Sequence, residues 1–204
     1  ANMQVLFDVK PLVTLFDYIN GHKKLQEVII ETKYPNLSLI AGKSGYQYAT
    51  NSSSFIFSRL VQDILDLNFY DILIVDTGAG LNDYVKEFLK VSTNILAITS
   101  TDPSALTDVY SLIKMLAIDK KSLMLCFNHT KNELVGETIS NSLINLAKKN
   151  RLKSEFVIKY IGSVPSSENI TKIARARKIF VNEFPQEDAA IKLHNIVDRV
   201  LKNI

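Results

Sequence analysis

The chain has 204 residues, of which 47% are hydrophobic and 22% are charged. These fractions are ordinary for a packed globular protein and exclude a largely disordered chain. The 24 Lys and Arg against 21 Asp and Glu give a net charge of +3, a balance that does not require nucleic acid as a partner. Because no run approaches the roughly 18 apolar residues of a membrane span, we expect a soluble cytoplasmic protein.

Strand and helix patterns alternate along the chain. Strands are predicted at 37–41, 70–76, 94–99, 123–127 and 156–161, and helices at 55–65, 83–89, 102–118, 137–149, 169–177 and 189–201. The unbroken apolar run Ile72–Val75 predicts a strand buried on both faces of a parallel sheet. Such alternation predicts right-handed βαβ units, so we expect one α/β domain over 1–204 with a mostly parallel sheet flanked by helices.

Ligands of such sheets bind beyond the carboxyl ends of the strands. The segment Asp76–Gly80 follows the predicted strand 70–76 and combines a carboxylate with two glycines. Asp76 can hold Mg²⁺ through water, and Gly78 and Gly80 can bring backbone N–H groups to a phosphate. The alternative is an Asp that caps the following helix beside a glycine-containing turn.

Three further features have one structural and one functional interpretation. Gly42-Lys43-Ser44 resembles the end of a P-loop, but the first glycine of that pattern is replaced by Leu37, so we expect a solvated loop lysine. Asn128 ends a predicted strand and either contacts a purine edge or makes a turn of its own. Cys126 lies in an apolar run, which favours a buried thiol over a nucleophile.

Two cationic stretches, 148–153 and 172–178, favour solvated helix ends, with an acidic partner or nucleic acid as the alternative. The apolar stripe of the last helix favours core packing over contact with a membrane surface. The scattered His and Cys residues offer no metal-ligand spacing.

Several segments together resemble one known family. They are Phe69–Gly80, Thr99–Tyr110, Phe127–Asn128 and Ile161–Pro165. With them the chain resembles the MinD/ParA-type deviant Walker ATPases over essentially its whole length, and it is most similar to the FlhG branch (FleN/YlxH). The resemblance implies a P-loop NTPase-like (SIMIBI-type) fold and, for this branch, regulation of the number and placement of flagella.

The resemblance also implies roles for individual residues. Asp76 matches the switch II acid that orients Mg²⁺ and water, and it would be the catalytic residue. Thr77, Gly78 and Gly80 match the loop that senses the γ-phosphate. Asn128 matches the adenine-reading Asn, and Pro165 and Ser167 match a loop that contacts the nucleoside. The family usually has acidic residues after that proline, where this chain has Ser166 and Ser167.

By resemblance the intact protein binds ATP with Mg²⁺, forms a nucleotide-sandwich homodimer and hydrolyses ATP slowly. Its implied partners are FlhF, a GTPase of the signal-recognition type, and flagellar switch proteins, whereas nucleic acid is not expected. It would be cytoplasmic and would reach the inner face of the membrane through a C-terminal helix, if one follows.

One departure from the family pattern is large. The strand, P-loop, helix and second strand with which such proteins begin have no counterpart here, and the chain starts near the segment that follows switch I. The P-loop normally supplies most of the phosphate contacts. We therefore expect this chain to be a fragment that binds ATP weakly or not at all, and whether it is a hydrolase stays open.

Other function classes remain as alternatives. One is a chromosome- or septum-positioning ParA/MinD homologue, and another is a non-catalytic interaction module on the same fold. A third is a phospho-receiver with Asp76 as acceptor, for which Asp8 is the only early acidic candidate. Partner capture, nucleotide binding and acetyl phosphate labelling would distinguish them.

Overall fold

The computed structural model describes residues 3–42, 54–120, 122–130, 132–150 and 155–204. The chain forms two compact units, one from 1–91 with 172–179 and the other from 92–171 with 180–204. Helix α8 (Glu168–Arg175) begins in the second unit and ends in the first. The prediction of one domain over 1–204 stays a prediction.

The first unit packs short helices around a small hairpin. Its elements are α1 (Met3–Leu6), α2 (Leu15–Ile19), α3 (Leu25–Val28), β1 (Ile29–Glu31), β2 (Ser38–Ile40), α4 (Ser54–Asp66) and α5 (Asp83–Val91). β1 and β2 are antiparallel, with Ile30 opposite Leu39. The unit's core comprises Leu15, Leu25, Val28, Leu60, Ile64 and Phe88. Apolar residues spaced three to four apart on α4 thus place Leu60 and Ile64 on its inner face.

The second unit contains a parallel sheet in the order β3–β4–β5. These strands are β3 (Leu96–Thr99), β4 (Ser122–Asn128) and β5 (Val157–Val164). The central strand β4 is buried from Leu123 to Phe127, as expected of a parallel strand covered on both faces. The register aligns Asn128 with Val164, so β4 and β5 end side by side.

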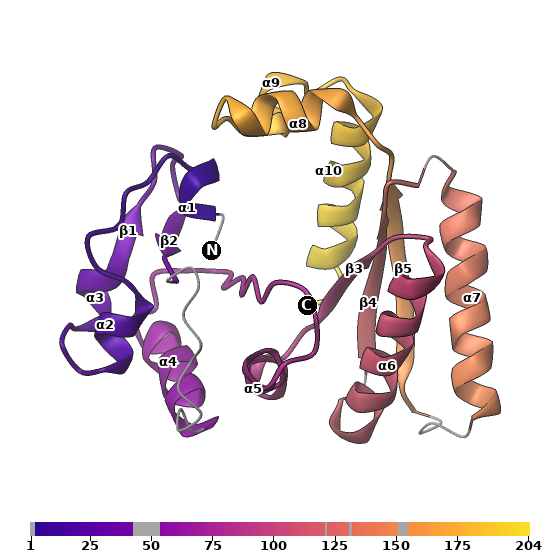
Figure 1. The fold of residues 1–204 in the computed structure, drawn as a ribbon, viewed down its shortest axis with the longest axis horizontal. Coiled ribbons are helices and arrows are strands. Elements are labelled where there is room, and N and C mark those ends of the chain that lie inside the picture. Colours follow the sequence, from indigo (N-terminus) through magenta and orange to yellow (C-terminus); the bar gives the residue numbers. More distant parts are fainter. Residues whose placement is uncertain (1–2, 43–53, 121, 131, 151–154) are drawn as a thin grey trace. The chain divides into compact units, whose positions relative to one another are not determined.

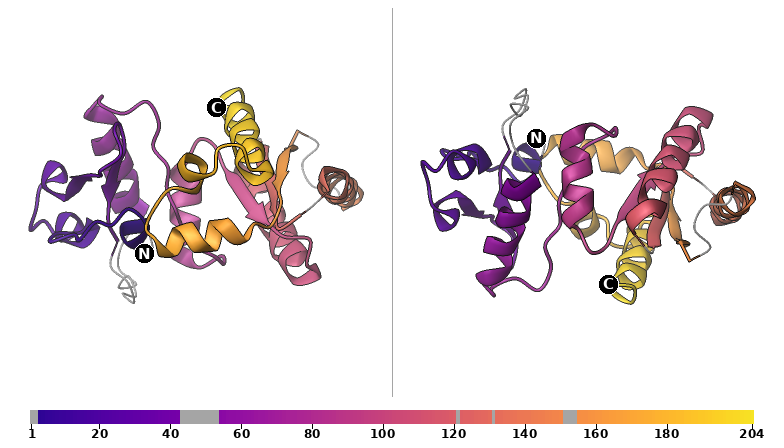
Figure 2. Two further views of the ribbon diagram at one scale, coloured as in Figure 1. Left: turned by 90° about the horizontal axis from the view of Figure 1, so that it is seen from above. Right: turned by 90° about the horizontal axis from the view of Figure 1, so that it is seen from below.

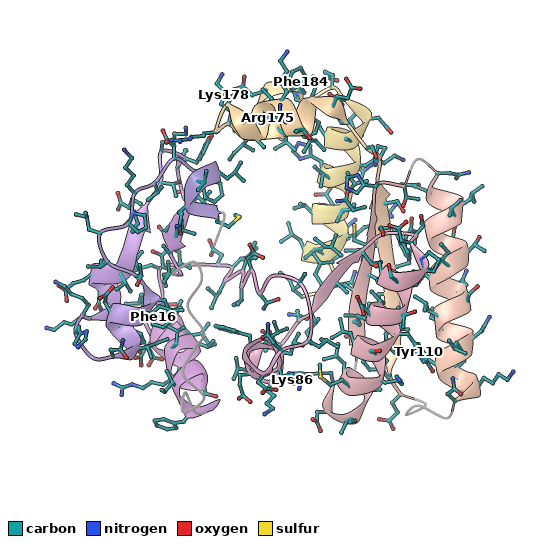
Figure 3. All side chains as sticks on the ribbon, in the orientation of Figure 1. Phe16, Lys86, Tyr110, Arg175, Lys178 and Phe184 are labelled. Carbon is teal, nitrogen blue, oxygen red and sulfur yellow. The ribbon has the colours of Figure 1, made fainter. Side chains whose placement is uncertain are left out.

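Helices cover both faces of this sheet (Figure 1). α6 (Pro103–Asp119) packs on β3 and β4, and α7 (Glu133–Lys149) packs on β4 and β5. α10 (Asp188–Leu201) packs on the opposite face of β5 and follows the short α9 (Phe180–Glu183). In both views of Figure 2, the sheet lies between α10 and α7. Tyr110 on α6, labelled in Figure 3, accepts a hydrogen bond from Asn150 Nδ2 at 2.7 Å.

Most of the expected elements are present, within a few residues of their predicted bounds. The predicted strands 37–41, 94–99, 123–127 and 156–161 correspond to β2, β3, β4 and β5, and the six predicted helices correspond to α4, α5, α6, α7, α8 and α10. Pro103 occupies the first turn of α6, where its missing N–H costs nothing. Lys43, Ser44 and 151–153 of the first cationic stretch lie outside the described residues.

The strand predicted at 70–76 is wrong, because this segment has no regular secondary structure. Most of its apolar side chains are exposed, with Ile74 84% exposed, while Val75 is partly buried against the core of the first unit. A strand requires a neighbour to satisfy its N–H and C=O groups, and no strand within the described residues pairs with this segment. An apolar run therefore favours a strand here but does not provide the partner that would form it.

Among the residues that the structure describes, none of the helices combines the length and the apolar composition needed to cross a bilayer.

Candidate functional site

The predicted site residues fall into two groups, one in each unit. Asp76, Thr77, Gly78 and Gly80 belong to the first unit. Asn128, Pro165 and Ser167 belong to the second. The structure brings the members of each group together locally, and the assignment of either group to a nucleotide stays a prediction.

The segment Asp76–Gly80 forms an exposed turn. The Asp76 carboxylate is exposed, and its Oδ1 accepts a long hydrogen bond of 3.4 Å from the Gly78 N–H. Gly78 and Gly80 have φ angles of 73° and 91°, while a Cβ at either position would meet nothing within 4 Å. Backbone conformation, not crowding, is thus what requires glycine there.

Asp76 does not cap the next helix, which was the alternative interpretation of this residue. Asn82 does so, because its Oδ1 accepts the Val85 N–H at 3.0 Å at the start of α5. Within the described part of the chain, Asp76 belongs to no cluster of three or more His, Cys, Asp or Glu side chains able to hold a metal ion. A single carboxylate fits an ion held through water better than a dedicated metal centre.

Asn128 ends β4 and makes a turn with its own backbone. Its Oδ1 accepts the His129 N–H at 3.0 Å, and His129 has a left-handed φ of 59°. This is the turn that we expected as the alternative to purine recognition. The two roles are compatible, since Oδ1 keeps a second lone pair and Nδ2 has no hydrogen-bond partner among the described residues.

The loop after β5 lies beside the end of β4. The Thr130 N–H donates to the Val164 carbonyl at 3.1 Å, and a 3.1 Å contact joins His129 Nδ1 to Ser166 Oγ. Pro165 is half-buried between these two attachments. The predicted nucleoside residues Asn128 and Pro165 are therefore brought to the same edge of the sheet.

Ser167 is engaged by the chain itself. Its Oγ accepts the Asn169 N–H at 3.1 Å at the start of α8, and its hydroxyl donates to Glu187. The same carboxylate accepts Asn169 Nδ2 at 2.9 Å. The hydrogen bonds from Ser167 and Asn169 lower the pKa of Glu187. Glu187 thus supplies a carboxylate to this loop from a distant part of the chain.

His129 and Glu187 were missed by the sequence analysis. The neighbourhood of Asn128 was a usable signal for His129, because the residue after a strand-end Asn shares its turn. No sequence signal linked Glu187 to Ser167, since only the fold brings the start of α8 beside the residue that precedes α10.

The remaining candidates have structural roles. Cys126 is 4% exposed, and burial raises the pKa of its thiol to about 11, which agrees with an inert buried thiol. Arg177 forms an ion pair with Asp8, while Lys172 and Arg175 are exposed in the last turn of α8. On α10, Ile196 is buried whereas Val197 and Leu201 are exposed, and Ile204, which lies beyond the helix, is exposed too. Core packing thus accounts for part of the predicted stripe.

No protein-family model matches the chain. The sequence is, however, similar to those of known proteins. The flagellum site-determining protein YlxH of Helicobacter pylori is 32% identical over 188 residues, a match that covers 92% of this chain and 63% of that protein. The antiactivator FleN of Pseudomonas aeruginosa is 27% identical over 204 residues, covering 98% and 71% respectively. The chain thus spans a little under two thirds of the length of YlxH.

Solved structures of MinD and ParA proteins share the fold. The cell division ATPase MinD of Pyrococcus furiosus matches with a TM-score of 0.81 at 16% identity, covering all of this chain and 82% of that one. MinD of Pyrococcus horikoshii, complexed with Mg-ADP, matches with a TM-score of 0.78 at 16% identity over 98% and 78%. A ParA family ATPase of Chlorobium tepidum matches with 0.69 at 18% identity over 96% and 79%. The chain therefore has the fold of the MinD and ParA ATPases and is similar in sequence to YlxH and FleN.

Proposed function

We propose that this protein acts as an FlhG-type regulator that binds ATP with Mg²⁺ and sets the number and placement of flagella through its partners. The observation that carries the proposal is the approach of Asn128 to the loop Pro165–Ser167 at the carboxyl ends of β4 and β5. Parallel α/β sheets bind their ligands at that edge. The name of one relative, a flagellum site-determining protein, supports the flagellar role, and that of the other, an antiactivator, supports a regulatory role.

The groups at this edge fit a purine base. Asn128 offers the amide N–H groups of Nδ2 and the remaining lone pair of Oδ1, the donor and acceptor that adenine pairs with at its N7 and N6. Asn128 is half-buried, so its amide is partly shielded from water while it stays open to a ligand. Pro165, also half-buried, adds an apolar contact for the nucleoside.

In this proposal Asp76 holds Mg²⁺ through water, and Thr77, Gly78 and Gly80 contribute the backbone that meets the γ-phosphate. The exposed carboxylate and the two left-handed glycines fit that role in part. When bound, Mg²⁺ neutralises phosphate charge. Since one carboxylate and a short turn make few phosphate contacts, we expect this chain by itself to bind nucleotide weakly, with a Kd on the order of 1 mM.

The proposal extends to partners. An ATP-dependent homodimer, the GTPase FlhF, flagellar switch proteins and the inner face of the membrane are the expected contacts of the intact protein. Capture of purified FlhF by the intact protein with ATP, and not with ADP, would support the flagellar assignment. Retention on DNA-coated beads without capture of FlhF would contradict it and favour a chromosome-positioning role.

Nucleotide binding is best tested by an NMR titration of the ¹⁵N-labelled chain with Mg-ADP and, separately, Mg-GDP. ADP is expected to shift the amide signals that follow β4 and β5, and GDP to shift them less. Asn128→Asp keeps the oxygen that accepts the His129 N–H and loses the Nδ2 donor, so it should reduce the ADP-induced shifts. Asn195→Asp, an exposed position on α10, is the matched control. Equal effects of the two substitutions, or no shifts in the unsubstituted chain, would contradict the proposal.

A further inference from the structure

We infer that His129 is an additional nucleoside-contacting residue, and that Ser166 positions its ring by occupying Nδ1. The inference rests on the proposed function, because it adds a residue to the same site. It begins with the backbone: His129 is a non-glycine residue with a left-handed φ of 59° at the end of a parallel strand. Such a conformation is uncommon for a residue that carries a side chain, so the surrounding structure must maintain it.

The bonds that maintain it are on both sides of His129. Asn128 Oδ1 accepts the His129 N–H at 3.0 Å, and the N–H of Thr130 donates to Val164 at 3.1 Å. Thr130 is only 6% exposed, whereas the His129 side chain is exposed. The fold therefore fixes the backbone of this turn and leaves an imidazole at the solvent edge of the sheet, where it contributes little to the core.

Among the residues that the structure describes, the ring is attached through one nitrogen. His129 Nδ1 lies 3.1 Å from Ser166 Oγ, on the loop that also carries Pro165 and Ser167. When the serine hydroxyl donates to Nδ1, the proton of a neutral imidazole resides on Nε2. Nε2–H then remains as a hydrogen-bond donor beside Asn128.

The orientation of the Asn128 amide follows from the same turn. A backbone N–H can only donate, so the amide atom that faces the His129 N–H is oxygen and the free end is the Nδ2 donor. Two adjacent residues thus present donors, Asn128 Nδ2 and His129 Nε2, together with one carbonyl lone pair. Purine nucleosides offer ring-nitrogen and ribose acceptors together with an exocyclic amine as donor, which is the complementary set.

A purely structural role for His129 makes a different prediction. If the ring only ties the two loops together, its loss would loosen 165–168 without changing nucleotide affinity. Ser166→Ala removes the same contact between the loops but keeps the imidazole ring, so it separates the two roles. His129→Asn is the better substitution at position 129, because Asn accepts a left-handed φ and the turn is retained.

The test is a titration with Mg-ADP in which the side-chain ¹⁵N signals of the histidines are observed. The His129 Nε2 signal is expected to move as ADP is added, while those of His22 and His194, both exposed elsewhere, stay in place. His129→Asn should weaken ADP binding about fivefold, the cost of one neutral hydrogen bond. Ser166→Ala should weaken it less, and His194→Asn should leave it unchanged.

The outcomes separate this inference from the proposed function. ADP binding that His129→Asn leaves within a factor of two, with a stationary Nε2 signal, overturns the inference alone. Faster amide hydrogen exchange in 165–168 without loss of affinity does the same and assigns the residue a structural role. If ADP perturbs no signal of the unsubstituted chain, the proposed function fails and the inference fails with it.

Discussion

Arg199 Nη1 donates a hydrogen bond to the carbonyl oxygen of Ile161, 3.1 Å away. Ile161 is the residue that the register of β4 and β5 skips, since Tyr160 pairs with Leu125 and Gly162 with Cys126. A bulged residue is left out of the ladder, so its carbonyl needs another donor. Helix α10 supplies that donor and thereby holds β5 in place just before the loop that carries Pro165.

The first prediction concerns this bond. Arg199→Gln should lower the free energy of unfolding by about 1 kcal/mol, at the low end for a charged donor because the pair is only partly buried. Lys202→Gln, an exposed cation at the end of the same helix, is the control and should change stability little. Urea unfolding followed by circular dichroism measures both. Identical urea midpoints for the two variants would show that the hydrogen bond from Arg199 to the Ile161 carbonyl does not stabilise the fold.

The second prediction concerns Gly162, which has a φ of 140° and faces α10. A Cβ at this position would lie 2.8 Å from Ile196 Cγ1, and its backbone conformation already disfavours other residues. Gly162→Ala should therefore destabilise the fold by about 2 kcal/mol through strain and overpacking. Gly21→Ala, with a φ of 73° in open space, isolates the cost of conformation.

A double substitution tests the steric part of this argument. Adding Ile196→Ala to Gly162→Ala removes the clashing atom, so the combined loss of stability should be smaller than the sum of the two single losses. Strict additivity in the urea midpoints would mean that the contact with Ile196 is not what excludes a side chain at position 162.

The third prediction concerns Cys126. Burial raises the pKa of this thiol to about 11, so almost none of it is thiolate at pH 8. The native chain should react with an aromatic disulfide reagent at least about tenfold more slowly than the chain unfolded in urea, where the pKa returns to its usual range. Rapid labelling of the native protein would revive the interpretation of Cys126 as a nucleophile.

The fourth prediction concerns Glu187 and pH. Because the hydrogen bonds from Ser167 and Asn169 lower its pKa in the folded state, the carboxylate stabilises the fold above the unfolded value of 4.5. That contribution is lost as pH falls from about 4.5 through the lowered folded value. Glu187→Gln should therefore reduce the melting temperature at pH 7 and flatten its decline below pH 4.5.

Thermal unfolding at a series of pH values measures this effect. Glu137→Gln, an exposed position on α7, serves as the control and should keep the slope of the unsubstituted chain. A Glu187→Gln profile parallel to that of the unsubstituted chain would mean that the carboxylate does not hold the loop at Ser167.

Some elements could be predicted because their signals are local. The apolar spacing on α4 and α6, Pro103 at the start of α6 and the continuous apolar run of β4 each depend on neighbours within a few residues. Segment 70–76 carried an equally strong apolar signal and is not a strand, because strand formation also needs a pairing neighbour that no local pattern supplies.

The sequence by itself determined how helices and strands alternate along 94–201, and it placed Asn128 and Pro165 at strand ends, because apolar periodicity and turn residues act over short distances. Only the tertiary structure decided that His129 meets Ser166 and that Glu187 meets Ser167. Those contacts join segments 20 or more residues apart, and their geometry follows from how β4, β5 and α10 pack, a property that no single segment encodes.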